Sequence, residues 1–303
     1  MAKSFDDEQA PILFKTHEEI LQRERFHANL QVEKGQLHRI VGGYDFDPDK
    51  KVICGLNSCN QPHQRGYVIA TKAGDETICG NVCGERELGV EFEDMANRFV
   101  ARVDIQNRQL TIRKLQETAN ARIEQATALK KEVDAVYSPL QEIRQAFRTD
   151  RDIDRVLTSL MRDGGTIRVR QKKTEIQRGL ANEIGRANLQ TIGIVRGIHA
   201  LRDYALAANL IEKDVLGTIS SVQQANVMEL KAKALTELTS RINSLPAAIT
   251  SVEKFISDAR QFLTRETLYE IAKLKDMDGV REHKLAPILQ KIAWRFYPFG
   301  PVS

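Results

Sequence analysis

The sequence has little proline, few aromatic residues and no long apolar run. It contains 8 prolines and 6% aromatic residues in 303 positions, and such a chain, rich in Ala, Leu, Ile, Glu, Arg and Gln, favours long helices. No apolar run approaches the roughly 18 to 20 residues of a membrane span. The opening residues, MAKSFDDEQA, lack the basic and apolar regions of a secretory signal. We therefore expect a cytoplasmic protein with no membrane partner.

An excess of one charge is also missing. Lysine and arginine number 45 against 41 aspartates and glutamates, which gives a net charge of +4. This mildly basic balance permits contact with nucleic acid and does not require it.

Common catalytic and nucleotide-binding motifs are absent. The chain has no G-x-x-x-x-G-K-[ST], G-x-G-x-x-G, H-E-x-x-H or G-x-S-x-G sequence, and each of these is a sign of a specific chemistry. His38 and His63 could act with a carboxylate in a metal nuclease, but nothing nearby supplies the paired acidic residues of a two-metal site. We therefore expect a non-enzymatic protein and keep a metal-dependent nuclease as the second alternative.

Cysteine is scarce, and all of it lies in one stretch. The four cysteines fall within CGLNSCNQPHQRGYVIATKAGDETICGNVC as two pairs, Cys54-x4-Cys59 and Cys79-x3-Cys83, with nineteen residues between the pairs. Four clustered thiolates suit a tetrahedral zinc ion, and a four-thiolate site is closed and structural. The sequence therefore predicts zinc as the cofactor, bound by Cys54, Cys59, Cys79 and Cys83.

Two alternatives to this ligand set stay open. The first pair has a gap of four where two is usual, and His63, four residues after Cys59, could replace one cysteine. The cysteines could also form two disulfides or remain buried free thiols. That reading is weaker, because four cysteines in 303 residues without a signal peptide is not a disulfide-dense composition.

The residues around the cysteines predict a hairpin followed by a helix. Residues 66–71 are β-rich, residues 72–75 can turn, residues 76–78 start back, and a helix is expected from Asn81 to about Leu88. The segment GYVIATKAGDETICGNVCGERELGVEF resembles treble-clef or ribbon-like zinc-finger segments in uncharacterised proteins of bacteria and their mobile elements. The resemblance is limited to residues 54–90. It implies zinc and little else, because such fingers serve DNA binding, RNA binding, protein docking and nuclease chemistry alike.

The rest of the chain predicts a mainly α fold: long helices or a coiled coil with a small β-containing zinc finger near the N-terminus. Thr16 and Glu19 form a capping box that opens a helix over 16–34. From Glu91 to Tyr137 there is no proline or glycine, and apolar residues recur every three or four positions. We expect helix breaks at the two prolines, Pro139 and Pro246. The expected divisions are 1–36 (N-terminal helix), 37–90 (zinc finger), 91–163 (long helix or coiled coil) and 164–303 (C-terminal helical region).

A basic run follows the Gly164-Gly165 turn. Residues 162–178 carry six lysines and arginines against two acidic residues. The segment TIRVRQKK could be a basic strand or the first turns of a helix, and its residues could contact phosphates or form a solvated loop. The candidate nucleic-acid-binding residues are Arg168, Arg170, Lys172 and Lys173.

Together these patterns predict a zinc-finger and coiled-coil protein that binds a macromolecular partner. Nucleic acid is slightly favoured over a protein bound through the helical region, and a homo-oligomer is a further candidate. The main alternative is a structural or adaptor subunit of a protein assembly.

Overall fold

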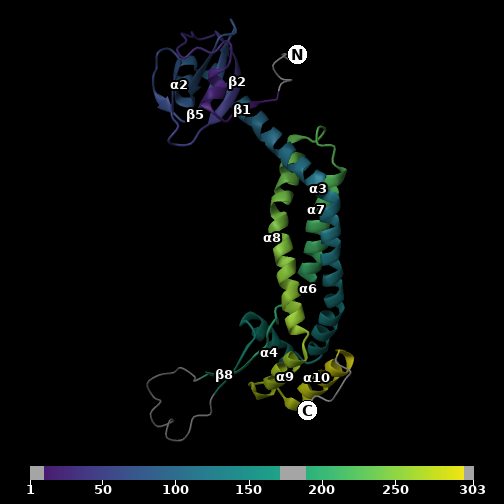
Figure 1. The fold of residues 1–303 in the computed structure, drawn as a ribbon. Coiled ribbons are helices and arrows are strands. Elements are labelled where there is room, and N and C mark those ends of the chain that lie inside the picture. Colours follow the sequence, from purple (N-terminus) through teal and green to yellow (C-terminus); the bar gives the residue numbers. More distant parts are fainter. Residues whose placement is uncertain (1–9, 171–188, 297–303) are drawn as a thin grey trace, which may run out of the picture. The chain divides into compact units, whose positions relative to one another are not determined.

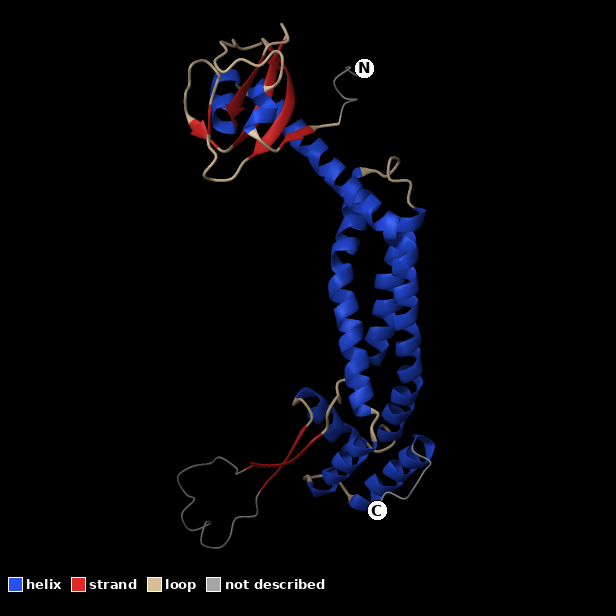
Figure 2. Cartoon of the chain, viewed as in Figure 1, coloured by secondary structure: helices blue, strands red, loops and turns tan. Residues whose placement is uncertain are grey.

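The computed structural model describes residues 10–170 and 189–296, most of them helical, with a small β region near the N-terminus (Figure 2). The chain divides into two compact units. The N-terminal unit comprises Met1–Arg113 and Val227–Thr236, and the helical unit comprises Lys114–Asn226 and Glu237–Ser303.

A four-stranded sheet forms the N-terminal unit (Figure 1). Strand β2 pairs antiparallel with β5, β5 pairs antiparallel with β6, and β1 lies parallel to β2 at the edge. A second, two-stranded ribbon is formed by β3 and β4. The antiparallel pairing of β5 with β6 confirms the hairpin predicted over residues 66–78. The strands are β1 (Ile12–Phe14), β2 (Leu37–Asp45), β3 (Val52–Ile53), β4 (Pro62–His63), β5 (Arg65–Thr71) and β6 (Glu76–Gly80).

Helix α2 (Asn81–Leu88) follows the hairpin directly, as the sequence predicts. It ends at Gly89, whose φ of 68° favours glycine, and α3 begins at the next residue. A Cβ on Gly84 would lie 2.3 Å from the ring of Phe92, so the missing side chain lets the first turn of α3 pack against α2. Helix α2, the hairpin and the start of α3 consequently share one core.

The helix predicted over 16–34 is wrong beyond its first turn and a half. Helix α1 covers only His17–Leu21. The segment that follows is held instead by the hairpin: Arg23 forms an ion pair with Glu76, and the backbone N–H of His27 donates to the Glu76 carbonyl over 2.8 Å. These long-range bonds outweigh the local helix propensity, which is a weak determinant of structure.

The Pro-free run is one helix, as predicted, and it continues past the expected break. Helix α3 spans Val90–Phe147 and includes Pro139. Helix α8 (Ala232–Phe262) likewise runs through Pro246. The predicted breaks are wrong because both prolines lie beside fully packed positions, Leu140 and Leu245, which are buried in the core of the helical unit. Burying such side chains offsets the roughly 3 kcal/mol that an internal proline costs.

Long helices line the core of the helical unit (Figure 1). Buried residues recur every seven positions along α3, a period typical of a helix-packing seam: Ala119, Ala126, Val133, Leu140 and Phe147. Within the ranges that the structure describes, no helix is long and apolar enough to cross a bilayer. In the described part of this unit, the other helical segments are α4 (Arg151–Arg162), α6 (Ala200–Asn209), a π-helix (Leu210–Leu216), α7 (Gly217–Gln224), α9 (Arg265–Ala272), a 3-10 turn (Lys273–Asp276) and α10 (Glu282–Phe296).

The basic run begins as a strand, which decides between the two structures that the sequence left open. Strand β7 (Thr166–Arg170) pairs antiparallel with β8 (Leu189–Ile194). The predicted turn before β7 is confirmed, with φ of 69° at Gly164 and 82° at Gly165. Only Gly165 is also confined by neighbours, because a Cβ there would lie 2.1 Å from the Val195 carbonyl oxygen.

This turn supplies a matched pair of variants. Gly165→Ala should lower the free energy of unfolding of the helical unit by about 3 kcal/mol or more, because it adds a backbone clash to an unfavourable φ. Gly164→Ala, with nothing within 4 Å of its new Cβ, should cost only about 1 to 2 kcal/mol. Urea unfolding followed by far-ultraviolet circular dichroism measures both, and equal losses would contradict the assigned clash.

Candidate metal centre

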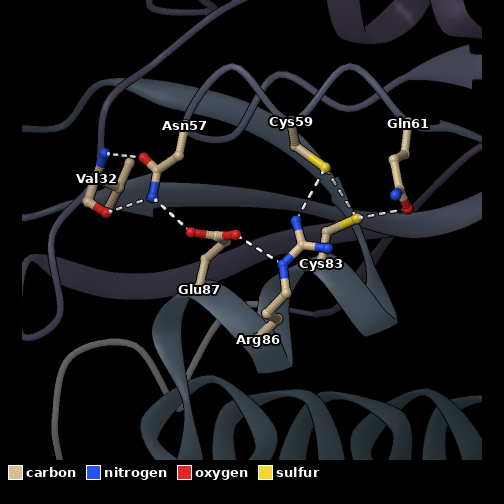
Figure 3. Close-up of polar contacts among 7 residues, drawn as sticks. All are labelled: Val32, Asn57, Cys59, Gln61, Cys83, Arg86 and Glu87. Atoms are coloured by element: carbon tan, nitrogen blue, oxygen red, sulfur yellow. Dashed lines mark hydrogen bonds and ion pairs between the residues drawn. The ribbon is translucent and has the colours of Figure 1, made fainter.

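Three thiols converge where the β3–β4 loop meets α2. Cys54 follows β3, Cys59 lies in the loop before β4, and Cys83 lies in the first turn of α2. Their sulfur atoms all lie within 4.8 Å of one another, and the Cys59 and Cys83 sulfurs are 3.4 Å apart (Figure 3). Sulfurs bound tetrahedrally to zinc at about 2.3 Å lie about 3.8 Å apart. The three thiols could therefore bind one metal ion.

Cys79 and His63 lie outside this group. Cys79 is fully buried in β6. Both ring nitrogens of His63 have other partners: Nε2 lies 2.5 Å from the Tyr44 hydroxyl and Nδ1 lies 3.2 Å from the Gln61 carbonyl oxygen. The structure thus brings together three of the four predicted ligands and leaves the role of Cys79 as a prediction. Across residues 10–170 and 189–296 it shows no other group of three or more His, Cys, Asp or Glu side chains placed to hold a metal.

Hydrogen bonds to the sulfurs prepare them to carry negative charge. The backbone N–H groups of Leu56 and Gly80 donate to the Cys54 sulfur, and that of Gln61 donates to the Cys59 sulfur. The Arg86 guanidinium donates to the Cys59 sulfur over 3.3 Å (Figure 3). Hydrogen bonds of this kind favour the thiolate form, which is the form of cysteine that binds a metal ion.

Burial determines the direction of the pKa shift at three of the four thiols. It raises the pKa of Cys54, raises that of Cys83 to about 12, and raises that of Cys79 well above its ordinary value. At Cys59 burial also acts to raise the pKa, but hydrogen bonds from Gln61, Cys83 and Arg86 outweigh it and lower the pKa. Without a cation the buried thiols are protonated at neutral pH. Metal binding here must therefore release protons.

The loop that carries Cys59 is held in an unusual backbone conformation. Asn57, Ser58 and Asn60 have φ values of 50°, 54° and 52°, in the left-handed region that asparagine tolerates better than most residues. The Asn57 side chain accepts from the Val32 N–H over 2.7 Å and donates to the Val32 carbonyl oxygen over 3.1 Å. Its amide nitrogen also lies 3.3 Å from the Glu87 carboxylate. Asn57 therefore joins the loop to residue 32 and to α2.

Only part of the predicted nucleic-acid site lies within the described residues. Arg168 and Arg170 are exposed, alternate with Ile167 and Val169 along β7, and therefore share one face of the ribbon. The Arg170 guanidinium lies 4.0 Å from the Asp278 carboxylate. The other two predicted residues, Lys172 and Lys173, lie outside the described residues.

Comparison with protein-family models, with curated proteins and with solved structures found no match for this chain. The resemblance of residues 54–90 to zinc-finger segments therefore stays a prediction that rests on the sequence alone.

The left-handed loop yields a prediction with an internal control. Asn57→Gly keeps the backbone conformation but removes the bonds to Val32 and Glu87, which should cost about 1 to 3 kcal/mol. Hydrogen exchange at the amides of β5 and β6, measured by mass spectrometry, should accelerate about 5- to 100-fold. Asn60→Gly, at an exposed residue whose side chain bonds only the nearby Ser58 carbonyl oxygen, should leave the exchange nearly unchanged. Similar exchange rates in the two variants would show that the Asn57 bonds contribute nothing.

Proposed function

We propose that this chain is a non-enzymatic zinc-binding protein whose metal stabilises a small β-containing finger and whose other surfaces bind a macromolecular partner. The observation that carries the proposal is the convergence of three sulfur atoms within 4.8 Å. Thiolate ligands favour zinc over the hard cations magnesium and calcium. A reducing cytoplasmic location suits these free cysteines.

Cys79 is the fourth ligand in this proposal. Its thiol is 0% exposed in β6, one residue before Gly80, whose N–H donates to the Cys54 sulfur. Burial raises the pKa of Cys79 well above its ordinary value, and the charges of the other three cysteines raise it further. A bound cation lowers the cost of ionisation most for a thiol buried this deeply, because a thiolate there would otherwise be an unpaired buried charge.

The surroundings of the thiols support a structural role for the metal. The Glu87 carboxylate on α2 accepts from Arg86 over 2.8 Å and from Asn57 over 3.3 Å. It is therefore engaged in holding the loop and is not free to act as a general base. The nuclease alternative finds no supporting group of acidic residues within the described part of the chain.

Nucleic acid is the favoured partner because the ribbon presents arginines on one exposed face. A two-stranded β-ribbon has dimensions that the major groove of a duplex can accept. Arg168 lies opposite Thr191 and Arg170 lies opposite Leu189 in the β7–β8 register, so the partner strand adds no acidic residue to that face. Arginine side chains in this arrangement can donate to phosphate oxygens in pairs.

An adaptor role is the second candidate, and a different observation favours it. Helix α3 carries exposed apolar side chains at Val100, Ile105 and Leu110, which a protein partner or a second copy could cover. The seven-residue spacing of buried positions on α3 suits a coiled coil. Salt-dependent binding to nucleic acid distinguishes the two roles.

Zinc content provides the first test. Protein purified without added metal should contain one zinc per chain by elemental analysis, and both Cys83→Ser and Cys79→Ser should remove most of it. His63→Gln should retain the zinc, since both His63 ring nitrogens bond elsewhere. Full zinc retention in Cys79→Ser would limit the site to three thiols, and loss in His63→Gln would restore the histidine alternative.

Salt dependence provides the second test. If both arginines contact phosphates, the double variant Arg168→Gln/Arg170→Gln should reduce the slope of log affinity against log salt on duplex DNA by about 1.8. Sequence preference should change little, because phosphate contacts position the protein without reading bases. Fluorescence anisotropy at several salt concentrations measures the slope.

The control removes two arginines of similar exposure from the same unit, Arg155 and Arg260, whose side chains are 73% and 66% exposed against 73% for Arg170. The control variant should keep the wild-type slope. Wild-type protein without salt-dependent binding to DNA or RNA would end the nucleic-acid proposal and favour the adaptor role.

A further inference from the structure

One of the four thiols differs from the rest in its access to solvent. Cys54, Cys79 and Cys83 are 1%, 0% and 4% exposed, whereas Cys59 is only partly buried. A small oxidant in solution can therefore reach Cys59. The other three cysteines are shielded from it by the core of the N-terminal unit. Reactivity among clustered cysteines follows access as well as thiolate character.

The surroundings of Cys59 favour reaction at its sulfur. Arg86 donates to this sulfur from α2 over 3.3 Å. A guanidinium in this position stabilises negative charge on the attacking sulfur. Arg86 is itself held in place by Glu87, which accepts from its Nε over 2.8 Å (Figure 3).

A second thiol lies within reach of the first. The Cys83 sulfur is 3.4 Å from that of Cys59, so the two atoms must approach by only about 1.4 Å to reach the length of a disulfide. Cys83 is anchored in α2, whereas Cys59 lies between Ser58 and Asn60 in the left-handed loop, outside regular secondary structure. The loop can therefore supply the movement without unwinding the helix.

We propose that Cys59 is an oxidation site for hydroperoxides and that Cys83 is its resolving cysteine. The Cys59 thiolate attacks one oxygen of the peroxide, the O–O bond breaks, and the alkoxide or hydroxide that leaves takes up a proton. The product is a sulfenic acid at Cys59. The Cys83 thiol then attacks that sulfur, its proton passes to the departing hydroxyl group to give water, and a Cys59–Cys83 disulfide forms. Two thiols are oxidised and one peroxide is reduced to an alcohol, or to water, plus water.

The consequence for the metal rests on the proposed zinc site. A disulfide removes Cys59 and Cys83 from the ligand set together. Cys54 and Cys79 then remain, and two thiolates do not complete the four-coordinate shell of a structural zinc ion. Oxidation that begins at the accessible Cys59 would therefore also release the metal from Cys54 and Cys79.

The test uses the full-length protein with its own metal and hydrogen peroxide as the oxidant. Zinc release is followed with a chromogenic indicator, and the oxidised cysteines are identified by differential alkylation and mass spectrometry. The expected result is one zinc released per Cys59–Cys83 disulfide, with Cys54 and Cys79 recovered as free thiols. Arg86→Gln should slow disulfide formation about 5- to 10-fold. Arg65→Gln, which removes an exposed arginine paired with Asp45 elsewhere in the same unit, should leave the rate unchanged.

The outcomes separate this inference from the proposed zinc site. If the protein carries zinc and peroxide oxidises all four cysteines at one rate, or pairs Cys59 with Cys54, the inference fails and the zinc site stands. An unchanged rate in Arg86→Gln also overturns the role given to that arginine. If the purified protein carries no zinc but peroxide still joins Cys59 to Cys83, the zinc site fails and the oxidation site stands.

Discussion

A thiolate buried in an apolar core needs a positive charge beside it, and this constraint organises the N-terminal unit. Three of the four cysteines are almost fully buried, and burial alone drives their thiols toward the neutral form. Backbone N–H groups at Cys54 and Cys59 and an arginine at Cys59 partly offset this effect of burial. These donors are too few to charge every sulfur, so the three buried cysteines would become thiolates only with a cation bound beside them.

The parts of the fold that were predictable from sequence are those determined locally. Strand β6 and helix α2 follow from β-rich residues, a turn and two glycines. The regular spacing of apolar residues from Glu91 to Tyr137 was also enough to predict a long helix. The segment after Leu21 was mispredicted because Glu76, more than fifty positions later, binds it. Pro139 and Pro246 were mispredicted for a related reason: the packing that keeps each helix intact comes from other helices.

The candidate site was predictable to a similar degree. The spacing of the cysteine pairs was enough to identify Cys54, Cys59 and Cys83 as neighbours, because a metal site leaves a pattern in residue type and interval. The supporting residues leave no such pattern. Arg86 looks like any helix-surface arginine, and the bonds of Asn57 to Val32 depend on a left-handed backbone that only the folded loop reveals. The sequence therefore predicts the sulfur ligands but not the residues that hydrogen-bond to them or hold their loop in place.

The buried seam of α3 also changes in size along its length, from Ala119 and Ala126 through Val133 to Leu140 and Phe147. Small side chains at a helix contact allow the two axes to approach to about 8 Å, whereas larger side chains hold them near 10 Å. The unequal side chains along this seam therefore suit a closer approach of neighbouring helices at Ala119 and Ala126 than at Leu140 and Phe147. Helix α4 adds Ile153 and Leu157 to the same core.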